Sequence, residues 1–187
     1  MTIGDVSVWE IYQMYSQLDM TGADYNRLVR KGWYWPFRQV LHYARPGSVR
    51  VAASSDDSQL RVLAFVRNGM TIVVLLNDLD STARTASLSG LVPGIYGLCQ
   101  SVNRGAYAEL GLQTVPGTGL LAVNVPGNTV LTLYPHPGSN LPPVAVDWKA
   151  AHRYLALPSS STTLSAAARD PELDPITYQW SVKRTPP

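Results

Sequence analysis

The chain has 187 residues, 45% of them hydrophobic, which is enough for one or two small domains with buried cores. Its formal net charge is only +2, and its Lys and Arg residues are scattered, which argues against a nucleic-acid partner. No run approaches the roughly 18 apolar residues of a membrane helix. Only 15% of the residues are charged, so a surface rich in Ser, Thr, Asn and Gln is expected, and this fits a secreted or cell-surface protein. Because the first residues lack a basic and an apolar region, we expect any export signal to lie upstream.

The first 46 residues have a different sequence pattern from the rest of the chain: a strand, a loop and a helix are predicted before a region of strands. Residues 5–13 predict a short strand that ends in aromatic residues, and a polar loop follows. A helix is then predicted from Pro36 to Ala44, because proline is tolerated in a first turn and the residue before Pro46 favours a helix end. Its predicted buried face has apolar residues at helical spacing: Phe37, Val40, Leu41 and Ala44.

The middle of the chain reads as an antiparallel β-sandwich. Short runs rich in Val, Leu, Ile and Thr alternate with turn residues such as Asn68-Gly69 and Pro126-Gly-Asn128. Residues 72–76 are continuously apolar, which predicts a central strand covered on both faces. The predicted strands are residues 48–53, 59–66, 70–77, 83–89, 94–101, 120–125 and 129–134.

The junction between helix and sandwich resembles that of family 30 glycoside hydrolases and their relatives. The similar stretches are 8–13, 33–39 and 42–51, the last reading His-Tyr-Ala-Arg-Pro-Gly-Ser-Val-Arg-Val, together with the hairpin of 63–66 and 72–77. This resemblance implies that residues 1–46 are the last strand and helix of a (β/α)8 barrel and that residues 47–137 are its C-terminal β-sandwich. It also implies that the catalytic barrel is a missing partner.

The resemblance further implies that both catalytic Glu residues of the family, at the ends of the fourth and seventh barrel strands, lie outside this chain. The residues support the same interpretation, because glycoside hydrolysis needs two carboxylates that face each other. Glu10 lies on the predicted strand, Glu109 in a predicted sandwich loop and Glu172 in a remote tail, so no pair is evident. We therefore predict no catalytic residue in the isolated chain.

The last part of the chain is separated by a proline-rich linker, residues 138–143. Residues 144–187 resemble the first half of a PKD-type, immunoglobulin-like module, with a predicted strand from Ile176 to Val182. A half module leaves an uncovered apolar face, so it is either the least stable part or borrows cover from the sandwich. Asp170, Glu172 and Asp174 read either as oxygen ligands for Ca²⁺ or as a solvated turn, and the turn is favoured.

Four aromatic residues are the candidate carbohydrate-binding residues. The family resemblance points to Trp9 as an aromatic floor at the end of the eighth barrel strand. Trp33, Tyr34 and Trp35 form a dense aromatic cluster, and aromatic faces stack on sugar rings. For Trp9 the alternative is a core tryptophan that truncation leaves exposed. For the other three it is packing of a helix against a sheet.

No cofactor or metal site is predicted. His42, His136 and His152 lack metal-ligand spacing, and Cys99 reads as a small buried hydrophobic residue. The expected fold is mainly β: a sandwich with a barrel remnant before it and a partial second sandwich after it. The expected role is a non-catalytic accessory region of a secreted glycoside hydrolase that braces the barrel and binds polysaccharide. The alternative is a structural spacer, and exposed apolar faces favour self-association.

Overall fold

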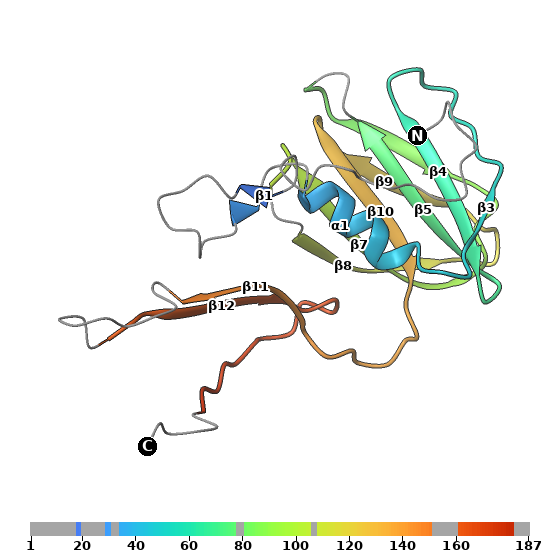
Figure 1. Cartoon of the computed structure of the whole chain (residues 1–187). Helices are drawn as coiled ribbons and strands as arrows, with labels where there is room; N and C mark the ends of the chain where they lie inside the picture. The colour runs from blue at the N-terminus through green and yellow to red at the C-terminus, as the bar shows by residue number, and fades with distance from the viewer. Residues whose placement is uncertain are drawn as a thin grey trace.

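The computed structural model describes residues 18–19, 29–30, 34–77, 81–105, 108–150 and 161–181. Figure 1 shows a β-sandwich with one helix on its outer face and a hairpin beside it. The elements are β1 (Leu18–Asp19), β2 (Val29–Arg30), α1 (Tyr34–Tyr43), β3 (Val49–Val51), β4 (Arg61–Arg67), β5 (Met70–Asn77), β6 (Arg84–Leu88), β7 (Gly94–Val102), β8 (Ala108–Val115), β9 (Leu121–Val125), β10 (Thr129–Pro135), β11 (Val144–Ala150) and β12 (Leu164–Arg169).

The sandwich has two layers, and every strand pair in it is antiparallel. The larger sheet has six strands in the order β3-β4-β5-β10-β7-β8, and the smaller one pairs β6 with β9. The core lies between the two sheets. Alternate residues of each strand point into it, and its main members are Leu60, Val73, Leu75, Ala86, Tyr96, Leu98, Val115, Val123, Val125, Leu131 and Leu133.

The larger sheet is covered on its second face as well. Strand β5 lies between β4 and β10, and its residues from Ile72 to Leu75 are all buried, which confirms the predicted central strand. A short apolar cluster on the outer face contains Cys99, Tyr134 and Val146. Cys99 is fully buried, as predicted. Helix α1 crosses this face over β7 and β10 (Figure 1).

Four sequence predictions differ from the structure. Glu109, which was predicted in a loop, lies in the edge strand β8. The predicted strand from Ile176 is wrong up to Ser181, since those residues join no ladder. The helix begins at Tyr34 rather than Pro36, and Leu41, predicted to be buried, is 59% exposed. The predicted strand of residues 5–13 lies outside the described residues.

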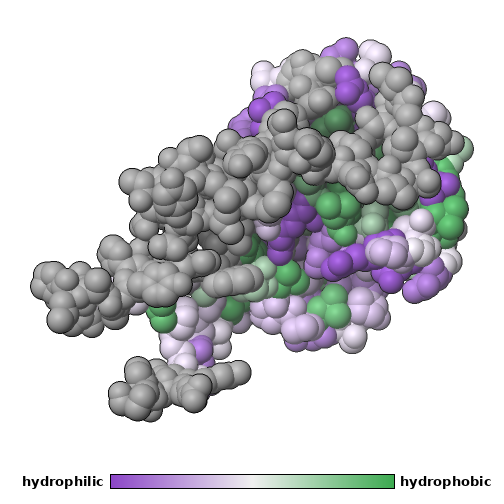
Figure 2. Space-filling model, viewed as in Figure 1, coloured by the Kyte–Doolittle hydropathy of each residue, from purple (hydrophilic) through white to green (hydrophobic). Residues whose placement is uncertain are grey.

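The segment after the sandwich contains a two-stranded antiparallel sheet, β11 with β12. A hairpin of two strands is marginally stable alone, and Val146 of β11 is buried in the cluster with Cys99 and Tyr134. Val146 is therefore covered by the sandwich, which is the kind of contact that the prediction of borrowed cover requires. No helix among the described residues is long and apolar enough to span a membrane. On the face seen in Figure 2, hydrophobic patches of the sandwich lie among hydrophilic residues.

Candidate functional site

The candidate site is the outer face of the larger sheet, where α1 is attached. Of the four predicted aromatic residues, Trp9 and Trp33 lie outside the described part of the chain. Tyr34 and Trp35 are both half-buried in the first turn of α1, with ring centroids 5.1 Å apart and planes at 83°. Trp35 also packs against the cluster of Cys99. Perpendicular rings do not offer one flat platform, so sugar contact by these residues stays a prediction.

Helix α1 is held to the sheet by a buried amide. The side chain of Gln39 is 1% exposed, and its Nε2 lies 3.0 Å from Thr132 Oγ1, 3.1 Å from Val130 O and 3.2 Å from Cys99 O. Its Oε1 accepts a hydrogen bond of 2.8 Å from Ser101 Oγ. The NH2 group and the oxygen of a buried amide both need hydrogen-bond partners. For Gln39 all of these partners lie on the two strands β7 and β10.

This amide explains why the prediction that Leu41 is buried is wrong, whereas Phe37, Val40 and Ala44 are half-buried. The outer face of β7 and β10 carries the hydroxyl groups of Ser101 and Thr132, which need hydrogen-bond partners once they are covered. Gln39 supplies those partners, so the helix turns this residue to the sheet and leaves Leu41 exposed. The sequence does contain an indication of this polar contact, because Ser101 and Thr132 are polar residues in strands that are otherwise mainly apolar.

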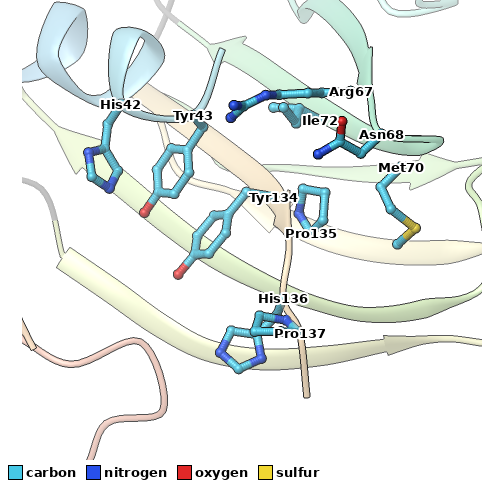
Figure 3. Close-up of a pocket in the computed structure, with 10 residues that line it drawn as sticks. All are labelled: His42, Tyr43, Arg67, Asn68, Met70, Ile72, Tyr134, Pro135, His136 and Pro137. Carbon is cyan, nitrogen blue, oxygen red and sulfur yellow. The ribbon is translucent and has the colours of Figure 1, made fainter. Parts of the chain in front are cut away.

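A second cluster lies at the C-terminal end of α1 (Figure 3). The rings of Tyr43 and Tyr134 stack with centroids 3.9 Å apart and planes at 15°. Their hydroxyl groups donate to the two oxygens of one carboxylate: Tyr43 to Glu109 Oε1 at 3.1 Å, and Tyr134 to Glu109 Oε2 at 2.8 Å. Glu109 is only 7% exposed, and residues from α1, β8 and β10 are thereby joined.

Burial dominates the acid–base properties of this cluster. Desolvation raises the pKa of Glu109, and the nearby charges of Asp170 and Glu172 raise it further, while the two tyrosine hydroxyls oppose the shift. Desolvation also raises the pKa of Tyr43 and of Tyr134. Both tyrosines therefore stay protonated and remain donors to the carboxylate.

A glycine makes room for this stack. Gly97 of β7 is the register partner of Tyr134, and the tyrosine ring lies directly over it. A Cβ at position 97 would come within 2.2 Å of Tyr134 Cζ. Position 97 therefore has to be a glycine for the ring to reach Glu109.

A cleft of about 470 Å³ opens beside the stacked tyrosines. This volume lies in the range of small-molecule sites. Arg67, at the end of β4, and Asn68, in the turn that follows, provide polar groups. The rest of the lining is aromatic, histidine or apolar (Figure 3). The lining residues are His42, Tyr43, Arg67, Asn68, Met70, Ile72, Tyr134, Pro135, His136 and Pro137.

One of these imidazoles is electrically neutral near pH 7. Burial lowers the pKa of His42, and the nearby guanidinium groups of Arg45 and Arg38 lower it further. Within the described residues, no group of three or more His, Cys, Asp or Glu side chains could hold a metal ion. The cleft therefore offers hydrogen bonds and apolar surface around an aromatic wall.

The carboxylates of the C-terminal segment are used in internal contacts. Asp170 Oδ1 accepts the backbone N–H groups of Glu172 and Asp174, both at 3.0 Å, and Asp170 is 5% exposed. Glu172 Oε1 lies 2.6 Å from His136 Nε2 and accepts the N–H of Leu141 at 2.9 Å. Residues 170–174 thus form a turn docked on the sandwich rather than a solvated one.

The fold places the chain in a structural class: antiparallel β-sandwiches in which a preceding helix packs on the outer face of one sheet. Residues 47–133 match the model of the glycosyl hydrolase family 30 beta sandwich domain. Over this range the chain resembles a family 30 β-sandwich domain, in agreement with the resemblance that the junction motif indicated. Among curated proteins, none matches the chain.

Solved structures share this fold. A family 30 endoxylanase from Clostridium papyrosolvens C71 aligns with a TM-score of 0.51 and 15% identity over 56% of this chain and 27% of that chain. A family 30 subfamily 8 xylanase from Clostridium acetobutylicum aligns with a TM-score of 0.52 and 18% identity, over 56% and 28%. This chain therefore spans little more than a quarter of those enzymes, and at such identities the likeness shows the fold alone.

Proposed function

We propose that this chain is the non-catalytic C-terminal accessory region of a secreted or cell-surface glycoside hydrolase, whose sandwich braces the catalytic barrel through α1. The observation that carries the proposal is the buried Gln39 side chain, which joins the helix to both central strands of the sheet. Two findings support an attached catalytic domain. The sandwich matches the family 30 model, and the chain aligns with only 27% and 28% of the length of the two related enzymes.

The test uses the longer hydrolase that carries this chain and compares it with its Gln39→Ala variant. Loss of one buried amide with several partners costs about 2 to 4 kcal/mol. A brace then predicts faster thermal inactivation of the variant, with kcat and KM unchanged at a permissive temperature. Thr85→Ala, at an exposed position on β6, is the control. An inactivation rate equal to that of the wild type, or a loss of kcat at the permissive temperature, would refute the brace.

We propose polysaccharide binding as a second role of the same face. It is supported by the half-exposed pair Tyr34 and Trp35 at the start of α1. In the sequence these two residues belong to the aromatic cluster of Trp33, Tyr34 and Trp35, and Trp9 is the fourth candidate. Aromatic rings of this kind supply apolar contact area, and their N–H or O–H groups bond hydroxyls. Charged residues are not required for a neutral polymer, which agrees with the composition.

The experiment is a titration of the purified chain with soluble β-glucans, xylans and galactans, followed by tryptophan fluorescence. Binding predicts a saturable change with one polymer that is lost in Trp33→Ala or Trp35→Ala and kept in Trp180→Ala, whose indole is exposed on the C-terminal segment. Circular dichroism establishes that each variant is folded. A flat response to every glycan rejects binding and favours the structural spacer.

A further inference from the structure

The cleft beside the stacked tyrosines combines an apolar floor with polar groups at its rim. Ile72 of β5 is 3% exposed and forms part of the floor, next to Tyr134 and Pro135. Arg67 lies on the same face of the sheet as Ile72, because it is two positions from Phe65, which is the register partner of Ile72. The guanidinium group and the apolar floor therefore belong to one surface.

Several polar atoms of the lining are already engaged. Both tyrosine hydroxyls donate to Glu109, and Figure 3 shows that they point away from Arg67. His136 uses both of its ring nitrogens, since Nδ1 accepts the N–H of Gly138 at 3.1 Å and Nε2 lies 2.6 Å from Glu172 Oε1. The tyrosines therefore offer a ligand their rings rather than their hydroxyl groups.

Three polar side chains of the described lining remain for a ligand. Arg67 and Asn68 are exposed, and neither side chain has a hydrogen-bond or ion-pair partner among the described residues. The φ angles of Asn68 and Gly69 are 51° and 75°, as in the tight two-residue turn of a hairpin, which holds both groups at the rim. The third group is His42, whose ring lies edge-on to Tyr43 with centroids 4.8 Å apart.

The charge at the rim is positive. Arg67 is charged at any pH of interest, and no Asp or Glu belongs to the described lining. A second guanidinium is close, because Arg45 Nε donates to His42 O at 2.9 Å. The carboxylates that contact lining residues, Glu109 and Glu172, are bonded to the tyrosine hydroxyls and to an imidazole. A guanidinium only donates and pairs best with a carboxylate, so the cleft favours an anionic acceptor.

The apolar part of the lining favours an aromatic body for this ligand. The side chains of Met70, Ile72, Pro135 and Pro137 carry no strong hydrogen-bonding group. A sugar ring has hydroxyl groups on every side, and each one buried without a partner costs free energy. A flat hydrocarbon ring has no such cost and gains from leaving water. The cleft volume of about 470 Å³ suits a small molecule.

We propose that this cleft is a binding site for a small aromatic carboxylate. The carboxylate pairs with the guanidinium of Arg67 and the side-chain amide of Asn68, and the ring lies against Ile72 and Pro135 beside the stacked tyrosines. The site does not include Tyr34 or Trp35, so it is independent of the proposed polysaccharide binding and of the brace. Because Arg67 is exposed, the ion pair is partly solvated and its contribution is modest.

The experiment is a titration of the full chain with cinnamate, followed by NMR of side-chain methyl groups. The reporters are Met70 and Ile72 in the cleft, and Val123, in the core between the sheets, is the internal reference. Two further ligands are matched probes: cinnamamide has the same ring without the charge, and galacturonate has the carboxylate on a sugar ring. Arg67→Gln removes the charge at the rim. Arg169→Gln, an exposed arginine on β12 outside the lining, is the control.

The proposal predicts saturable shifts of Met70 and Ile72 with cinnamate in the wild type and in Arg169→Gln, while Val123 does not shift. Arg67→Gln should weaken cinnamate binding about fivefold, and cinnamamide should bind the wild type more weakly by a similar factor. The proposal is overturned by a lack of saturation below about 20 mM, by a change smaller than about twofold in either comparison, or by tighter binding of galacturonate than of cinnamate. The comparison of cinnamate with cinnamamide uses the wild type, so it tests the proposal even if Arg67→Gln does not fold.

Discussion

Replacing Gly97 by alanine should break the stack of Tyr43 and Tyr134. The added Cβ would lie 2.2 Å from Tyr134 Cζ and 2.4 Å from its Oη, and atoms cannot approach so closely. The obstacle is an aromatic ring in a packed cluster, so the ring must leave its place over β7. The change of one methyl group therefore removes contacts that belong to three elements of the fold.

The expected cost adds three effects. Overpacking of a buried site costs about 1 to 3 kcal/mol, loss of an aromatic pair about 0.5 to 1.5 kcal/mol, and loss of the hydroxyl bond to a charged group about 1.5 to 3 kcal/mol. Such terms are not additive for neighbours, so we expect Gly97→Ala to lower the free energy of unfolding by about 3 to 5 kcal/mol.

Urea unfolding followed by far-UV circular dichroism measures this difference. Gly117→Ala is the matched control, because a Cβ there would meet nothing within 4 Å, and it should change stability by less than about 0.5 kcal/mol. In a Tyr134→Ala background the clash disappears, so adding Gly97→Ala should cost almost nothing. A loss below about 1 kcal/mol for Gly97→Ala alone, or an equal loss in both backgrounds, would refute the reasoning.

Three further predictions concern other buried or half-buried groups. The Nδ2 of Asn77 lies within 3.1 Å of the carbonyl oxygens of Thr82, Val125 and Pro126. Asn77→Ala should therefore lower the free energy of unfolding by about 2 to 4 kcal/mol in urea unfolding, and a loss below about 1 kcal/mol would contradict this prediction. Burial lowers the pKa of His42 in the folded protein, so the unfolded chain binds more protons, and the free energy of unfolding should fall as the pH drops through the ordinary imidazole pKa of about 6.5. His42→Gln should weaken this dependence in thermal unfolding scans at several pH values, and an unchanged dependence would contradict the prediction. The thiol of Cys99 is fully buried, so it should react with a thiol reagent only at the rate of unfolding, whereas fast reaction in native buffer would show that the outer face opens.

Most of the sandwich could be predicted from its local pattern. All seven predicted strands have a counterpart in the structure, because apolar alternation and turn residues act within a few positions of the chain. Strand β8 was missed for the same reason. Gly111 interrupts its pattern with a positive φ of 82°, and Glu109 and Gln113 are polar residues in a strand. Pairing with β7, a tertiary contact, is what fixes this segment as a strand.

The candidate site could be predicted only in part. The aromatic residues at the start of α1 stood out by composition, and the structure places Tyr34 and Trp35 together there. The contact of Glu109 with Tyr43 joins residues 66 positions apart, so nothing local in the sequence indicates it. The helix face was misjudged because apolar spacing was weighed and the hydroxyl groups on the facing strands were not.

The way in which Gln39 fastens α1 has a consequence for exchanging such domains between enzymes. An apolar helix face tolerates small slides along a sheet, whereas hydrogen bonds to defined atoms permit one position and one rotation of the helix. A sandwich transplanted beneath this helix would therefore have to bring hydroxyl groups at the places of Ser101 and Thr132. Without them the buried amide would lose its partners, and the graft would be unstable however well its apolar core was packed.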